Sequence, residues 1–220
     1  MDPSPPAEER ILQAALRRFA LDGLTAPLRT VAQDAGVSAG LIIHHYGSRE
    51  HLLERCDRRA LEVTRESKVG VLTGGAGVLL SQLAEAERYA PVVGYVLRRL
   101  QAGGPLALQL VEDFAAQAVV YLAEGERAGT ISSSRDPEAR AHVLVEMALG
   151  SLLLQLPAQR DHLDLAELPR WLRAHSERIV PPLLEIYTFP LLTDRSLYDA
   201  LLTSLEGEEP PSPPTDGTHS

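Results

Sequence analysis

The stretch AGVSAGLIIHHYGSREHLL, residues 35–53, decides the expected fold of the N-terminal part of this chain. In its centre, a short apolar run followed by two adjacent histidines occupies residues 39–46, between Ser38 and Gly47. A serine in front of such a run is a favourable N-cap, and a glycine behind it ends a helix without strain. The pattern therefore predicts a short helix over residues 39–46.

The preceding helix is expected to end at Gly36, only a Gly-Val-Ser turn away. So short a connection makes two helices cross steeply, which requires a small residue at the crossing and a turn residue that accepts positive φ. Ala32 supplies the first and Gly36 the second, while Val31, Val37 and Ile42 can fill the core between the helices. This arrangement predicts a helix-turn-helix, whose second helix reads DNA.

Helical spacing continues on both sides of this hairpin, and the sequence shows no convincing strand alternation. We expect a first helix over Ala7–Asp22 and a second that is N-capped by Thr25, with Pro27 in its first turn. Ser48 is expected to cap a fourth helix that runs to about Ser67. After a loose glycine-rich segment at 70–77, further helices are expected at 78–89, 92–102, 106–125, 137–156, 168–187 and 194–205.

These segments predict an all-α fold, with an N-terminal three-helix helix-turn-helix domain followed by a C-terminal helical domain. Pro181 and Pro182 are expected to kink or restart the helix that contains them. The expected divisions are a disordered N-terminus at 1–6, a helix-turn-helix domain at 7–50, a helical domain at 51–206 and a disordered tail at 207–220.

The composition narrows the classes of protein that this chain can be. Hydrophobic residues make up 45% of it, which is enough for a core, and Cys56 is its only cysteine, so no internal disulfide can form. No apolar run reaches the ~18 residues of a membrane span. The N-terminus lacks a secretory signal, so we expect a cytoplasmic protein without a membrane partner.

The net charge of −9 argues against a general polyanion binder. The charge is uneven, however, because residues 1–67 hold nine Arg against ten Asp and Glu. A near-neutral N-terminal unit can therefore still present a basic face.

The adjacent His44 and His45 could be a metal site, a catalytic dyad or an exposed helix face. Neighbours on a helix point about 100° apart, so the two side chains cannot share a metal ion. We interpret His44 as facing DNA and His45 as lying near the backbone or packing against the first helix, although either can be a plain surface or packing residue. The sequence has no nucleophile elbow, phosphate loop or zinc-protease motif, so we expect no catalytic residues, no metal and no cofactor.

Residues 19–53, FALDGLTAPLRTVAQDAGVSAGLIIHHYGSREHLL, resemble the tetracycline-repressor (TetR) family of bacterial transcription regulators. The likeness lies in the order of the helix, glycine, threonine, Ala-Gly-Val-Ser turn, apolar helix and Ser-Arg-Glu segments. It implies a DNA-binding regulator whose partner is a double-stranded DNA operator. The positions that match the family's DNA contacts are Arg29, Ser38, Ala39, Gly40, Ile43, His44, His45, Ser48 and Arg49.

The chain departs from the family pattern at four positions of this region. Many relatives have Lys, Thr, Tyr and Lys where this chain has Ala39, Leu41, Ile43 and Gly47. We therefore expect fewer direct contacts, with a larger role for helix N-terminal amides and for apolar contacts with thymine methyl groups. The alternative is a helical protein-interaction module whose degenerate helix-turn-helix does not bind DNA.

The resemblance further implies a homodimeric repressor on a palindromic operator, released by an unknown small-molecule effector. The dimer would form through residues 143–156 and 168–187, with a monomer core as the alternative. The candidate effector pocket is mostly apolar, which suits a mainly hydrophobic molecule, although such a stripe is more often core. Its lining would be Tyr95, Leu110, Phe114, Gln117, Tyr121 and Met147.

Overall fold

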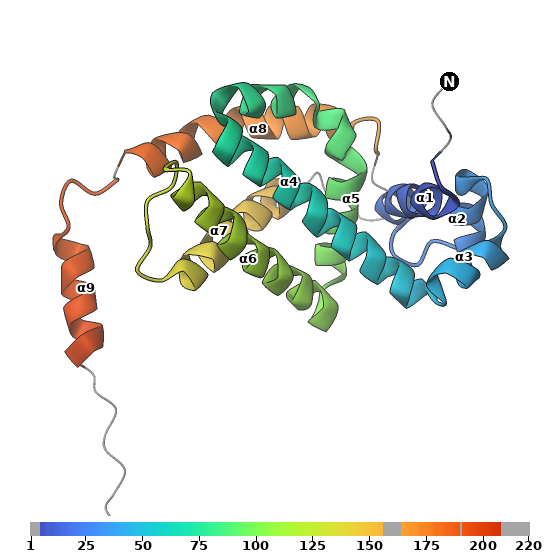
Figure 1. Cartoon of the computed structure of the whole chain (residues 1–220), viewed down its shortest axis with the longest axis horizontal. Helices are drawn as coiled ribbons and strands as arrows, with labels where there is room; N and C mark the ends of the chain where they lie inside the picture. Colours follow the sequence, from blue (N-terminus) through green and yellow to red (C-terminus); the bar gives the residue numbers. More distant parts are fainter. Residues whose placement is uncertain (1–4, 156–163, 190, 208–220) are drawn as a thin grey trace, which may run out of the picture. The chain divides into compact units, whose positions relative to one another are not determined.

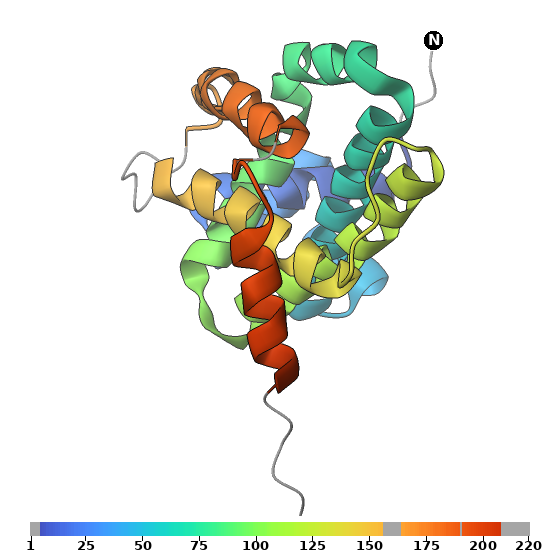
Figure 2. The ribbon, with the colours of Figure 1, turned by 90° about the vertical axis from the view of Figure 1, so that its left-hand side faces the viewer.

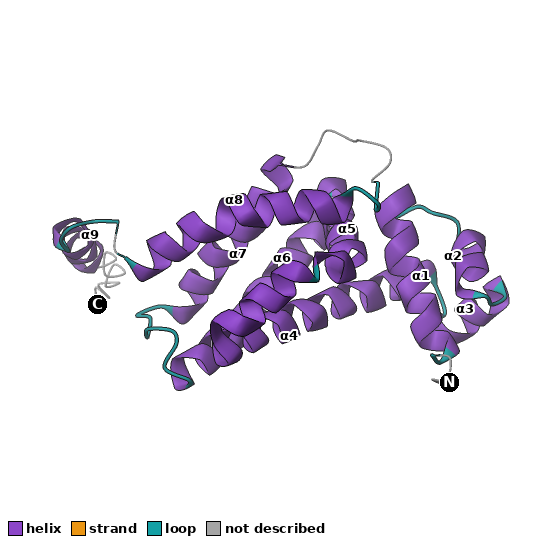
Figure 3. Ribbon diagram, turned by 90° about the horizontal axis from the view of Figure 1, so that it is seen from above, coloured by secondary structure: helices purple, strands orange, loops and turns teal. Residues whose placement is uncertain are grey.

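The computed structural model describes residues 5–155, 164–189 and 191–207, and these ranges contain helices and no strand (Figures 1 and 3). The all-α prediction is thereby confirmed. The chain forms two compact units, residues 1–177 and residues 178–220. The helices are α1 (Ala7–Asp22), α2 (Leu28–Ala35), α3 (Ala39–Tyr46), α4 (Arg49–Ala84), α5 (Ala86–Ala102), α6 (Gly104–Arg127), α7 (Pro137–Gln155), α8 (Leu168–Thr188) and α9 (Ser196–Gly207).

The first three helices follow the sequence pattern, with one correction. α1 and α3 have the expected bounds. α2 begins at Leu28, so Thr25 is not its N-cap; Pro27 takes that place in an extended conformation, without a side-chain cap. The proline ring disfavours helical geometry in the residue before it, so the helix cannot extend back to Ala26.

The long helix α4 turns back on itself at Gly75, as its teal and green parts show in Figure 2. Gly75 has φ 72° and ψ −159°, a conformation that residues with a Cβ avoid. Two hydrogen bonds join the helical parts on either side of Gly75. The Ser67 hydroxyl donates to Gln82 Oε1 at 2.7 Å, and Gln82 Nε2 donates to the Ser67 carbonyl at 3.1 Å. These residues would lie about 22 Å apart on a straight helix. The glycine-rich segment therefore forms a sharp bend between two helical parts, rather than the loose segment that we expected.

Prolines lie inside two of the later helices. Pro91 falls within α5, where the sequence suggested the start of a helix, because the chain breaks earlier, at Glu85. In α8 a restart at Pro181 and Pro182 is excluded, since the helix continues to Thr188, whereas a kink there stays a prediction. Each proline removes the donor to the carbonyl four residues earlier, and the first compact unit ends at Glu177, one of those positions.

The main core joins the helix-turn-helix to the helices that follow. Its fully buried side chains include Phe19 of α1, Val31 of α2, Ile42 of α3, Leu52 of α4 and Tyr95 of α5. The core therefore holds α1, α2 and α3 against one end of α4 (Figure 1).

Among the described residues, α6 is long and apolar enough to cross a membrane by length and composition, with a mean hydropathy of 1.4 over its best window. The expectation that no segment reaches that size is therefore too strict. One face of α6 is buried against α4 and α7, and a core helix of a compact domain passes the same test.

Some sequence expectations fall outside the described residues. They are residues 1–4 of the expected disordered N-terminus, Leu156 at the end of the expected dimer segment, and residues 208–220 of the expected tail.

Candidate nucleic-acid interface

The turn between α2 and α3 has the geometry that a tight helix crossing requires. Gly36 adopts left-handed φ 64° and ψ 40°, and its N–H donates to the Gln33 carbonyl at 3.2 Å. The Val37 N–H donates to the Ala32 carbonyl at 3.0 Å, which closes the end of α2. Since Val31 and Ile42 are fully buried, the predicted small core between the two helices is confirmed.

The two faces of α3 differ in exposure. Ile42 is fully buried and Tyr46 is nearly so, whereas the opposite side faces solvent. The exposed positions are Ser38, Ala39, Gly40, Ile43, His44 and His45. The residues that the sequence assigned to DNA reading on α3 thus come together on one accessible surface, which we call the α3 face.

Tyr46 anchors α3 to the first helix. Its hydroxyl donates to the Glu8 carbonyl, in the first turn of α1, at 3.0 Å. Burial raises the pKa of Tyr46 to about 12, so the phenol keeps its proton at neutral pH. Of the two roles that the sequence suggested for His45, packing against α1 is wrong, because His45 is exposed, whereas a position near the DNA backbone stays a prediction. The helical spacing of Ile42 and Tyr46, four residues apart, was the signal for the correct inward pair.

The two histidine rings lie edge to face, with centroids 5.7 Å apart and an angle of 70° between their planes. Within the described ranges, no three His, Cys, Asp or Glu side chains lie close enough to hold a metal ion. The pair is best read as part of the α3 face.

Serine caps fix the starts of the two helices that flank this face. The Ser38 Oγ accepts a hydrogen bond from the Leu41 N–H, and the Ser48 Oγ accepts one from the His51 N–H, both at 3.2 Å. Each cap satisfies one of the unpaired N–H groups of a helix start and leaves others facing outward. Such N-termini favour phosphate groups.

The two arginines expected to contact DNA have different surroundings. Arg29 is exposed near the start of α2. Arg49 instead directs Nη1 to the carbonyls of Leu24 and Ala26, at 3.2 Å and 2.6 Å. Arg49 therefore ties the loop before α2 to the start of α4, a role that the sequence pattern did not indicate.

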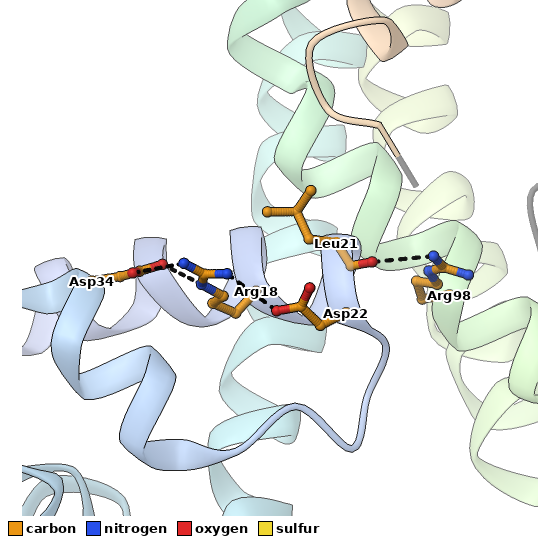
Figure 4. Close-up of polar contacts among 5 residues, drawn as sticks. All are labelled: Arg18, Leu21, Asp22, Asp34 and Arg98. Carbon is orange, nitrogen blue, oxygen red and sulfur yellow. Dashed lines mark hydrogen bonds and ion pairs between the residues drawn. The ribbon is translucent and has the colours of Figure 1, made fainter. Parts of the chain in front are cut away.

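Ion pairs and carbonyl contacts brace the rear of the helix-turn-helix (Figure 4). Arg18 of α1 lies between two carboxylates, with Nη2 2.9 Å from Asp34 Oδ1 of α2 and Nη1 3.2 Å from Asp22 Oδ2. Arg18 lowers the pKa of Asp34 through these hydrogen bonds. From α5, Arg98 donates to the carbonyls of Ala20 and Leu21 at 3.0 Å and 3.3 Å, and its side chain is buried.

Contacts from distant parts of the sequence, such as that of Arg98, have no local signal, and sequence reasoning missed them. Arg98 satisfies carbonyl groups at the C-terminal end of α1, which an intrahelical donor cannot reach. It therefore links the reading part of the chain to α5.

The residues proposed to line an effector pocket do not all lie as expected. Tyr95 is fully buried, and its hydroxyl contacts the Leu53 carbonyl at 3.0 Å and Asp57 Oδ1 at 2.6 Å. Leu110 and Phe114 belong to the main core, whereas Met147 is 46% exposed. None of the six lines the cavity of about 530 Å³ that lies between α1, α4 and α5.

Comparison with known proteins places this geometry in a family. Residues 11–56 match the model of the bacterial regulatory proteins of the tetR family, and residues 87–193 match the tetracyclin repressor-like C-terminal domain. The HTH-type transcriptional regulatory protein RaaS of Mycobacterium tuberculosis is 42% identical over 204 residues, which span 92% of this chain and 95% of that protein. The chain belongs to the TetR family.

Solved structures of other proteins share the fold. A TetR-family transcriptional regulator from Rhodococcus sp. superposes with a TM-score of 0.53 at 20% identity, over 76% of this chain and 97% of the other. Salmonella enterica GusR gives a TM-score of 0.50 at 20% identity, over 77% and 94%. As a member of the TetR family, the chain is a DNA-binding transcriptional regulator, and the interaction-module alternative is not favoured.

Proposed function

We propose that this chain represses transcription as a cytoplasmic homodimer, whose two α3 faces bind the halves of a palindromic operator. The observation that carries the proposal is the α3 face itself, which is exposed while Ile42 and Tyr46 fix the helix from behind. One short helix reads few base pairs, so a symmetric pair of heads supplies the specificity.

Exposed apolar side chains support the dimer. On α7, Val143, Met147 and Leu154 are 53%, 46% and 83% exposed. On α8, Leu184 and Tyr187 are also exposed. Burying such residues between two copies removes apolar surface from water, which is the main source of association energy.

An effector would release the repressor if it bound more tightly to the dimer when the spacing of the two helix-turn-helix domains does not fit the operator. Linkage requires such an effector to weaken DNA binding by the coupling free energy, typically ~1–3 kcal/mol. The long helix α4 connects the α3 face to the remaining helices of its unit and can transmit the change.

The test is operator binding to the DNA upstream of the protein's own gene, measured by fluorescence anisotropy over a range of salt concentrations. Arg29→Ala should weaken binding about equally for all sequences and reduce the salt slope, as expected for a phosphate contact. His44→Ala should change the preferred sequence, at a cost of ~1–3 kcal/mol for the preferred base.

Arg127→Ala provides the control, because Arg127 is exposed in the last turn of α6, outside the α3 face and outside the two expected dimer segments. Its affinity and salt slope should equal those of the wild type. A salt slope near zero for the wild type would contradict the proposal and favour a protein-interaction module.

A further inference from the structure

The cavity of about 530 Å³ lies within the unit of residues 1–177, between the first helix of the reading head and the two helices α4 and α5. The bend at Gly75 creates its shape, because it returns Gln82 to the side of Ser67. Its lining is Glu9, Leu12, Gln13, Leu16 and Arg17 of α1, Arg59, Val63, Glu66, Ser67 and Gln82 of α4, and Arg88, Tyr89, Pro91 and Val92 of α5.

The lining combines apolar and cationic groups. Leu12 and Leu16 of α1, with Val63 and Val92 opposite, form an apolar part of the wall. The charged groups of the lining are the guanidinium groups of Arg17, Arg59 and Arg88 and the carboxylates of Glu9 and Glu66.

Ion pairs account for part of this charge. Arg59 lies 3.5 Å from Glu62 and 4.0 Å from Glu66, and Arg88 lies 3.6 Å from Glu85. Arg88 stands at the rim, since its side chain is 76% exposed. Guanidinium groups bind planar or tetrahedral oxyanions through paired hydrogen bonds. Arg17 of the lining forms no ion pair with the described residues, so its guanidinium group is available to a ligand. The cavity therefore favours one class of ligand, an organic anion that carries an apolar body.

We propose that this cavity is a regulatory site for an organic anion with an apolar body, such as a carboxylate or a sulfonate. The effect on DNA binding rests on the function proposed above, whereas the binding itself does not. A ligand here touches α1 directly, so it acts on the reading head without a relay through α4.

The contacts of α1 show how occupancy would reach the α3 face. Arg10 of α1 donates from Nε to the Ala35 carbonyl at the end of α2, at 3.1 Å, and Arg18 pairs with Asp34 of the same helix. α1 and α5 are otherwise held together by their packed faces and by Arg98. A molecule wedged between α1 and α5 thus changes the position of the helix that carries α2 and α3.

The test uses 8-anilino-1-naphthalenesulfonate, an aromatic anion that fluoresces when it leaves water, and N-phenyl-1-naphthylamine, its neutral counterpart. Both are titrated into the full-length protein without DNA. Val63→Trp fills the cavity and should weaken binding of the anion at least tenfold. Val120→Trp, the matched control on the exposed surface of α6, should leave it unchanged.

Arg88→Glu tests the charge without a risk to folding, because the side chain is largely exposed. It should weaken binding of the anion about tenfold, as expected for the loss of one charged hydrogen bond, and leave binding of the neutral compound unchanged. Equal binding of the anion by wild type and by both cavity variants would overturn the site, since the probe would then bind elsewhere. Equal losses of both compounds in Arg88→Glu would overturn the anionic class.

The regulatory part is measured separately, as operator affinity with and without saturating anion. Wild type should change its operator affinity by about 5- to 150-fold, and Val63→Trp should not respond. Anion binding that leaves wild-type operator affinity unchanged overturns the regulatory role. If the wild type binds no operator at all, the proposed function fails, while the titrations without DNA still decide whether the cavity is a site.

Discussion

The Arg49 guanidinium group holds two carbonyls of the loop that leads into α2. This contact positions the start of α2, where Arg29 lies exposed. Arg49 can therefore act on DNA binding in two ways. It can contact a phosphate directly, or it can position Arg29 through the start of α2.

Arg49→Lys separates these two roles, because lysine keeps the charge but cannot reproduce the guanidinium geometry. We expect the free energy of unfolding in urea to fall by ~1–2 kcal/mol, the cost of leaving a part-buried carbonyl poorly satisfied. Arg29→Lys, on an exposed side chain, should unfold like the wild type. Wild-type stability in Arg49→Lys together with lost operator affinity would show that Arg49 acts on phosphate instead.

The ion pair between Arg18 and Asp34 should make stability depend on pH. Arg18 lowers the pKa of Asp34 below its ordinary value of 3.8. A carboxylate of this kind stabilises the fold above its ordinary pKa, and the contribution disappears as the pH falls through the lowered pKa. The effect is modest, since both side chains are about 30% exposed.

We expect Asp34→Asn to lose ~0.5–1 kcal/mol of unfolding free energy at pH 7, as for an ion pair near the surface. The difference from the wild type should shrink as the pH falls from 3.8, where the Asp34 carboxyl of the unfolded chain gains its proton, through the lowered pKa of the folded state. Glu54→Gln, an exposed change on α4, is the control. A difference that grows on acidification would contradict this assignment.

Among the elements, the bend in α4 depends on one residue. Gly75 is the position inside α4 that departs from helical geometry, while Gly77 has no positive φ and open space around its Cα. The two glycines lie two positions apart in the sequence and have different structural demands.

Gly75→Ala should lower the free energy of unfolding by ~1–3 kcal/mol, because alanine is strained at this φ and ψ. Gly77→Ala should be neutral or stabilise by up to ~1 kcal/mol, because alanine favours the helix. Urea unfolding of the two variants measures the contrast. Equal stability of both would mean that the bend does not require Gly75.

The predictability of each element follows the range of the contacts that define it. α1 and α3 were predicted to their ends, since Ser38, Gly23 and Gly47 are local signals. The start of α2 was missed because the effect of Pro27 on its predecessor outweighed the cap at Thr25. The bend at Gly75 was visible only as a glycine-rich segment, since the Ser67 to Gln82 contact that defines it spans fifteen positions.

The candidate interface was more predictable than the effector site. The family resemblance, carried by local motifs within residues 19–53, indicated which positions of α3 would face outward. The cavity, by contrast, joins side chains from residues 9 to 92. Apolar periodicity cannot distinguish a core position from a cavity wall, which is why Tyr95, Leu110 and Phe114 proved to be core.

For the whole molecule, dimerisation should couple stability to concentration. A protein whose folded form associates is stabilised by mass action, so its Tm rises with concentration. Met147→Arg, on the exposed part of α7, should remove this dependence by placing a charge in the proposed interface. Val120→Arg makes the same kind of change on α6 and should keep it. A wild-type Tm that is independent of concentration, with a monomeric mass in sedimentation equilibrium, would contradict the dimer.

The Arg98 contact has a consequence for protein engineering. The last turn of α1 depends on a donor from α5, about eighty positions later in the chain. A chimaera that joins only the first ~50 residues to the ligand-binding domain of another regulator would leave these carbonyls without a hydrogen-bond donor, unless that domain has an equivalent cation. Modular exchange of heads between such regulators should thus succeed when the joint preserves this long-range cap, and grafts that ignore it should yield poorly coupled hybrids.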